Sequence, residues 1–105
     1  MSTYILHVES RPASDEVLDE FNRWYEEVHL PEVVALDGFV SAVRYAPTAA
    51  GGRYITQYTI EGDPEQAVKN VTAAAADGRL HMSDTMSLDP VPRLQIMKVT
   101  KEYRP

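Results

Sequence analysis

The chain has 105 residues, which is enough for one domain of ordinary size and too few for two. Hydrophobic residues at 44% and charged residues at 25% are typical of a globular protein with a modest core. The net charge of -6 argues against a nucleic-acid partner, and the lack of cysteine excludes disulfides, thiolate nucleophiles and cysteine-ligated zinc.

The first predicted element is a strand over residues 3–10, which are rich in β-branched and aromatic residues and precede a turn. Their alternation gives one apolar face and a second face that carries His7, as is typical of a sheet covered on both sides. Met1 leads directly into this strand without a basic and apolar leader, and no apolar run is long enough to cross a bilayer. We therefore expect a cytoplasmic protein with no membrane partner.

An amphipathic helix is predicted next, with Ser14 as its N-cap. Apolar residues recur at helical spacing and form one stripe: Val17, Leu18, Phe21, Trp24, Tyr25 and Val28. Pro31 disfavours helical backbone at the residue before it, so we predict that the regular helix ends near His29 and that a further turn opens at Pro31.

The remaining elements are strands over residues 39–46 and 53–61, a helix from the N-cap Asp63 to the stop at Gly78, and a strand over residues 93–103. The irregular segment between them, residues 79–92, is long enough to suggest a functional loop. The order predicts an α+β protein of the ferredoxin-like βαββαβ type, with an antiparallel sheet, in one domain over residues 1–105. Several strands are apolar on both faces, so we expect a homodimer in which a second sheet covers the first.

The segment from Trp24 to Tyr45 also resembles a known family. It combines Trp24, the sequence His-Leu-Pro at residues 29–31, the turn Asp-Gly-Phe at residues 37–39 and a strand that ends in Arg44 and Tyr45. This segment is similar to the dimeric α+β barrel proteins, especially the EthD-like branch and its relatives among stress-responsive barrel domains and small polyketide cyclases. The resemblance implies two ferredoxin-like subunits packed sheet to sheet, each with a pocket between its sheet and helices. Cyclases, isomerases, cofactor-free monooxygenases and haem enzymes share this fold, which therefore does not select one activity.

His29 is the first candidate catalytic residue, because it lies four residues after Tyr25 and sits beside the apolar stripe. A helix C-terminus favours the protonated imidazole and burial favours the neutral one, and either effect can produce a general acid or base that works near neutral pH. A histidine that only caps the last carbonyls of its own helix is the alternative.

His81, in the irregular segment, is the second candidate catalytic residue, since the resemblance implies a catalytic histidine after the second helix; a surface histidine is the alternative. The candidate substrate-binding residues are Trp24, Tyr25, Arg44, Tyr45, Tyr54 and His7. A guanidinium or a phenol among them could stabilise an oxygen that gains charge, although packing in the core or at a dimer interface would also explain these side chains. The histidines lack the spacing of a helical metal site, so no metal is expected.

We therefore expect a small, cofactor-independent isomerase, cyclase or lyase that uses histidine acid/base chemistry on a carbonyl-containing or polyphenolic small molecule. The alternative is a non-catalytic or stress-associated barrel protein whose pocket only binds a small molecule. A haem enzyme or a cofactor-free monooxygenase is the third possibility.

Overall fold

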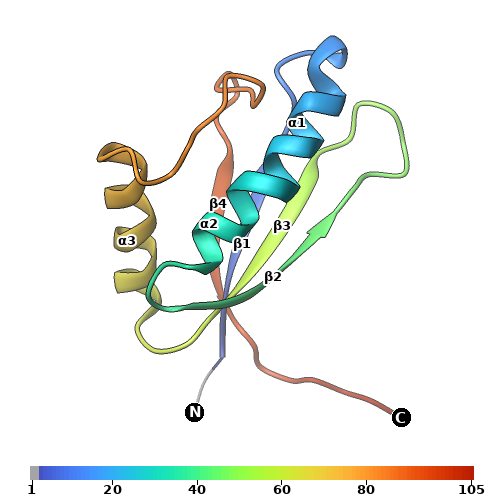
Figure 1. Cartoon of the computed structure of the whole chain (residues 1–105). Helices are drawn as coiled ribbons and strands as arrows, with labels where there is room; N and C mark the ends of the chain where they lie inside the picture. Colours follow the sequence, from blue (N-terminus) through green and yellow to red (C-terminus); the bar gives the residue numbers. More distant parts are fainter. Residues whose placement is uncertain (1–2) are drawn as a thin grey trace.

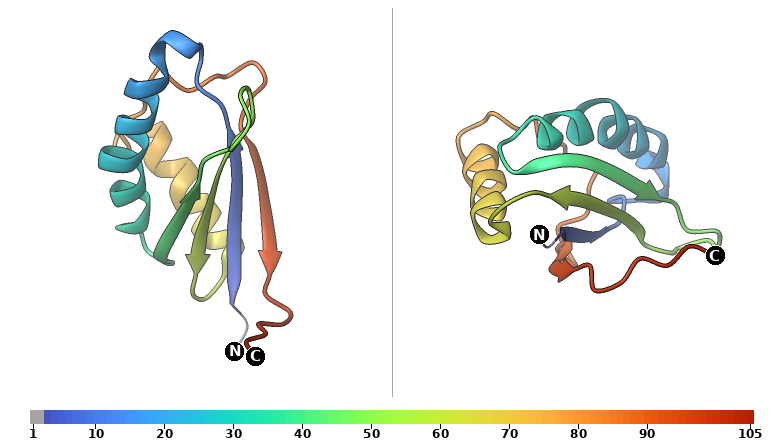
Figure 2. Two further views of the ribbon diagram at one scale, coloured as in Figure 1. Left: turned by 90° about the vertical axis from the view of Figure 1, so that its right-hand side faces the viewer. Right: turned by 90° about the horizontal axis from the view of Figure 1, so that it is seen from below.

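The computed structural model describes residues 3–105 as one sheet with helical segments on one of its faces (Figures 1 and 2). The strands are β1 (Tyr4–Ser10), β2 (Phe39–Tyr45), β3 (Tyr54–Ile60) and β4 (Arg93–Lys98). The helical segments are η1 (Asp15–Val17), α1 (Leu18–Trp24), η2 (Tyr25–His29), α2 (Leu30–Val34) and α3 (Pro64–Ala76). Within this part of the chain, no helix is both long enough and apolar enough to span a lipid bilayer.

The sheet has the strand order β2-β3-β1-β4, and every neighbouring pair is antiparallel. The prediction of an α+β protein with an antiparallel sheet is therefore confirmed, and the order is compatible with the ferredoxin-like arrangement. In the register of the central strands, Leu6 of β1 lies opposite both Tyr58 of β3 and Ile96 of β4. The three side chains consequently share one face of the sheet.

The core lies between the sheet and the helical segments. Leu6, Tyr58 and Ile60 from the strands are buried against Val33 of α2, while Phe21 of α1 forms a second cluster with Tyr25 and Met86. The other face of the sheet has no covering element within residues 3–105, as the view along the sheet in Figure 2 shows.

The helical segments α1, η2 and α2 form one continuous helix, here called the middle helix. It differs from its predicted form, because it does not end near His29. The backbone passes from α1 through the π-helical turn η2 into α2 and stays helical to Val34. In this turn the Leu30 N–H donates to the Tyr25 carbonyl five residues earlier. Pro31 lacks an N–H and crowds the preceding turn of a regular α-helix, and the wider π turn accommodates it without ending the helix.

The last two elements show one agreement and one difference. The α3 helix begins as predicted, with the Asp63 side chain accepting a hydrogen bond from the Glu65 N–H at 3.0 Å, and it stops before Gly78, whose φ is +85°. Strand β4 ends at Lys98, five residues earlier than the predicted residue 103. Lys98 pairs with Tyr4, the first residue of β1, and just beyond it the Val99 N–H donates to the Thr3 carbonyl at 2.9 Å.

Candidate functional site

A cavity of about 150 Å³ lies between the helix-covered face of the sheet and the residue 79–92 loop. Its floor includes Leu6 and Tyr58, and one wall is formed by Tyr25, His29 and Val33. Side chains of α3 form the opposite wall, and the loop contributes Leu80, Met82, Met86 and Pro92. In Figure 1 the orange loop crosses from α3 toward β4, beside the middle helix. The lining is almost entirely apolar, so its few polar residues are the candidates for specific contacts with a ligand.

His29 is held in the wall of this cavity by the π turn. Its imidazole stacks on Trp24, with 4.7 Å between ring centroids, and meets the Tyr25 ring edge to face at 4.9 Å. Its Nδ1 is buried, and no residue of the described chain forms a hydrogen bond with it. Because π turns inside α-helices recur at functional sites, this placement strengthens the candidacy of His29. Since the helix continues past His29, the helix-cap alternative no longer explains this residue.

Burial sets the protonation state of His29. Desolvation lowers the pKa of the imidazole from 6.5 to about 4, and the nearby carboxylate of Glu32 opposes this shift without reversing it. His29 is therefore neutral at pH 7, when one ring nitrogen carries a proton and the other is an acceptor.

Tyr58 is the second lining residue with a buried polar atom. Only 2% of this residue is exposed, and within residues 3–105 the one side chain close enough to hydrogen-bond its hydroxyl is that of Tyr25, in poor geometry. Burial raises the pKa of the phenol well above its usual range, the charge of Tyr25 and its side-chain hydrogen bond to Tyr58 raise it further, and Arg44 opposes the shift. Tyr58 therefore stays protonated.

The loop over the cavity is fastened to the middle helix at His81. The Trp24 indole donates to the His81 carbonyl at 2.7 Å, and the Glu32 carboxylate accepts from the His81 N–H at 2.8 Å and pairs with Nδ1 of its ring. The His81 side chain is 76% exposed and does not line the cavity. The structure thus brings His81 close to Trp24 through its backbone and to Glu32 through both its backbone and its ring, while most of its imidazole is exposed.

Glu32 is the site residue that sequence reasoning missed. It lies three residues after His29, a spacing that places two side chains on the same side of a helix. Because the sequence analysis ended the helix near His29, it did not place His29 and Glu32 on the same helix. Hydrogen bonds from His81 lower the pKa of Glu32, so its carboxylate is charged at neutral pH.

Arg44 lies next to the cavity rather than in its lining. Its guanidinium carbon is 4.6 Å from the ring centre of Tyr25 and 4.7 Å from that of Tyr54. It also donates to Glu26 and Asn22, both at 2.9 Å. One face of the cavity wall, the Tyr25 ring, is therefore packed against a fixed positive charge.

The other candidate binding residues lie away from the cavity. His7 is on the uncovered face of the sheet, where its Nδ1 is 3.1 Å from the amide of Gln57. Tyr45 is on the same face and is 48% exposed. Tyr54 packs against Phe21 under Arg44 and does not line the cavity of His29.

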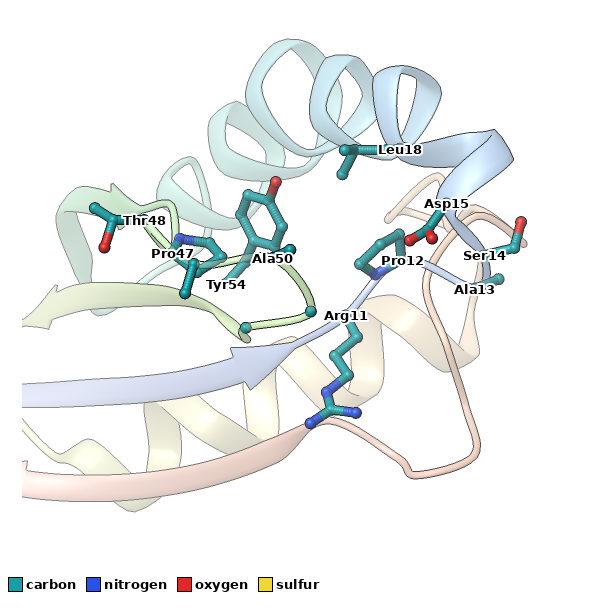
Figure 3. Close-up of a pocket in the computed structure, with 13 residues that line it drawn as sticks. Arg11, Pro12, Ala13, Ser14, Asp15, Leu18, Pro47, Thr48, Ala50 and Tyr54 are labelled. Carbon is teal, nitrogen blue, oxygen red and sulfur yellow. The ribbon is translucent and has the colours of Figure 1, made fainter.

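Tyr54 instead lines a larger, open groove of about 530 Å³ at the end of the sheet (Figure 3). The groove lies between residues 11–15, the start of α1 and the β2–β3 hairpin loop. Figure 3 shows that the Arg11 side chain points away from it toward β4. The groove contains neither an unpartnered buried polar atom nor any of the three histidines, so we regard the smaller cavity as the better candidate site.

The described residues 3–105 contain no group of three or more histidine, aspartate or glutamate side chains placed to hold a metal ion. What the cavity does have is a neutral imidazole and a protonated phenol among its lining residues and an otherwise apolar, partly open interior. These groups can bind an oxygen atom and can accept or return a proton.

No protein-family model matches the sequence, and no curated protein matches it either. The resemblance to the dimeric α+β barrel proteins therefore stays a prediction, and inferences about function rest on the cavity itself.

Proposed function

We propose that this chain binds a small, mostly apolar molecule that carries an oxygen function, in the cavity beside His29. The observation that supports this proposal is an apolar, partly open cavity whose lining includes two polar residues, His29 and Tyr58, with a buried Nδ1 and a buried hydroxyl that lack hydrogen bonds of good geometry. A buried polar group without a partner costs about 1–3 kcal/mol, and a ligand oxygen would remove that cost.

Binding is tested by a thermal-shift and NMR screen of small oxygen-containing ring compounds. We expect hits that perturb the resonances of His29 and Tyr58. His29→Ala should lose these hits, whereas His7→Ala, on the opposite face of the sheet, should keep them. Hits that persist unchanged in His29→Ala would place the binding site elsewhere and would contradict the proposal.

A second candidate function is catalysis of a proton transfer on the same ligand, as in a cofactor-independent isomerase, cyclase or lyase. The neutral imidazole favours it, because a free ring nitrogen can accept a proton from carbon beside a carbonyl and return it to another atom of the same molecule. Tyr58 would donate a hydrogen bond to the carbonyl oxygen as it gains negative charge. The low pKa of His29 makes it a weak base, however, and this is why we rank binding first.

Deuterium exchange separates the two candidates. A catalyst should transfer solvent deuterium to the carbon beside the carbonyl of a bound cyclic ketone, and His29→Asn should abolish the transfer. Binding without exchange at saturating ketone would exclude the proton-transfer function for that ligand.

We also infer that the uncovered face of the sheet forms a homodimer. Val43 and Tyr45 are 53% and 48% exposed on this face, and Ile5 and Ile55 add apolar surface beside them. Val43→Glu should shift the sedimentation equilibrium toward monomer, whereas Leu88→Glu, an exposed residue of the residue 79–92 loop, should not. A wild-type chain that sediments as a monomer at high micromolar concentration would refute the dimer.

A further inference from the structure

We propose that the ligand of this cavity carries an alkyl chain that is longer than the cavity, and that the outer part of the chain lies on Leu94 and Ile96 of β4. The inference rests on the proposed function, since it names the class of ligand that the same cavity would take. Three observations support it: the position of the opening, the small volume of the cavity, and the exposed apolar side chains that continue from the opening along β4.

The exposure of the lining residues indicates where the cavity opens. Leu6 on the floor and Tyr25 on the wall of the middle helix are buried. Met82 and Leu94, in contrast, are 49% and 56% exposed, and Ala75 of α3 is exposed as well. The opening therefore lies between α3, the residue 79–92 loop and β4. In Figure 1, β4 is the strand seen between α3 and the middle helix.

The volume of the cavity limits how much of a ligand it can hold. The cavity measures about 150 Å³. An engineered protein cavity of about this volume accommodates benzene, so roughly six carbon atoms fit inside. Because the cavity is partly open, a longer ligand is not excluded, and its remaining atoms extend through the opening.

Beyond the opening, Leu94 and Ile96 form a short apolar path along β4. They are two residues apart and lie opposite Val8 and Leu6 of β1, so both side chains are on the helix-covered face of the sheet. Leu94 lines the cavity, whereas Ile96 lies outside it and is 39% exposed. The apolar path is therefore continuous with the interior of the cavity.

The composition of the apolar path favours an alkyl chain. Gln95 lies opposite His7, on the uncovered face of the sheet, so its amide is not available to the path. Lys98 is the next residue of β4 on the helix-covered face, and it ends the path. A surface without donors or acceptors binds a ligand by removing apolar area from water. An alkyl chain is flexible enough to cover two side chains that are about 7 Å apart along a strand.

The test compares the dissociation constants of 1-hexanol and 1-decanol, measured by NMR titration of the full chain. A carbon atom on the apolar path is buried on one side only, so each should raise the affinity about 2-fold, and wild type should bind 1-decanol roughly 10- to 20-fold more tightly than 1-hexanol. In Ile96→Ser this ratio should fall to about 3- to 5-fold, while the affinity for 1-hexanol stays unchanged. Val40→Ser, which changes an exposed side chain on β2 at the opposite edge of the sheet, should leave both constants unchanged.

The outcomes separate this inference from the proposed function. Equal binding of the two alcohols by wild type would show that the ligand ends at the opening, which overturns the inference and leaves the binding cavity in place. A ratio that Ile96→Ser does not change overturns the placement of the chain on β4. If neither alcohol binds, the proposed function fails together with the inference.

A second measurement covers the case in which Ile96→Ser does not fold. In wild type, 1-decanol should shift the methyl resonances of Ile96 and 1-hexanol should not, whereas Ile55, on the uncovered face, should respond to neither. Unchanged Ile96 resonances at saturating 1-decanol would contradict the inference. A shift of these resonances when the ligand-free chain is concentrated would show that a second copy of the chain covers the apolar path, and this result would also overturn it.

Discussion

Replacing His29 by asparagine should remove a specific part of the pH dependence of stability. In the folded chain the pKa of His29 is lowered from 6.5 to about 4 by burial. Below pH 6.5 the unfolded chain therefore takes up a proton that the folded chain does not. The stability tied to neutral His29 is present in full above about pH 6.5 and is lost as the pH falls toward about 4.

The magnitude follows from the size of the pKa change. A difference of about 2.5 between the two states corresponds to about 3 kcal/mol over the whole range. About 2 kcal/mol of this should already be lost by about pH 5. The perturbation is therefore large compared with the usual error of an unfolding free energy.

Urea unfolding of wild type and His29→Asn at about pH 7.5 and about pH 5 measures this quantity. Both chains lose stability at the lower pH as their carboxylates and other histidines titrate, but wild type should lose about 2 kcal/mol more. His7→Asn, which changes a histidine on the uncovered face, is the matched control and should retain most of the wild-type pH dependence. Two results would refute the reasoning. One is an equal loss of unfolding free energy in wild type and His29→Asn between the two pH values, and the other is an NMR titration of His29 with a pKa near 6.5.

Three further substitutions probe the surroundings of the site. Trp24→Phe removes the hydrogen bond to the His81 carbonyl, so it should cost about 1 kcal/mol and speed amide hydrogen exchange in the loop over the cavity; unchanged exchange would show that this bond does not hold the loop. Arg44→Met keeps an apolar stem but removes the guanidinium stacked among aromatic rings, so chemical denaturation should show an unfolding free energy lower by about 2 kcal/mol. An unchanged free energy would show that this charge does not stabilise the fold. Asp63→Ala should lower stability by about 1 kcal/mol through loss of the N-cap of α3, whereas Asp63→Asn should retain most of it in the same assay.

The strands and helix α3 were predictable because the residues that specify them are close together in the sequence. Alternation along residues 4–10 placed Leu6 on the buried face, and Asp63 with Pro64 gave a helix start that depends only on neighbouring backbone groups. The early end of β4 was not predictable from its own residues. Its last residue, Lys98, lies opposite Tyr4 of β1, and the length of a strand depends on such pairing between distant segments.

The site was only partly predictable for the same reason. His29, Trp24 and Tyr25 come together because they are close in sequence on one helix. The roof of the cavity comes from a loop more than fifty residues later, and the contact that holds it joins Trp24 to a backbone carbonyl, a group that every residue possesses. The sequence therefore cannot indicate which carbonyl accepts this hydrogen bond. Tyr45 and Tyr54 were drawn into the prediction by residue type, whereas strand register sends their side chains elsewhere.

The π turn at residues 25–29 also has a consequence for how this chain could change in length. It brings into line two helical pieces that a regular α-helix would hold in a different rotational phase, because each residue of an α-helix adds about 100°. Deleting one residue from the turn would leave eleven α-helical steps of about 100° between Phe21 and Val33, which is about 20° from three full turns, so both side chains should stay in the core. The helix can therefore lose one residue at this turn and keep its buried side, while the β2–β3 hairpin loop, with Gly51 at its exposed tip, should accept an insertion.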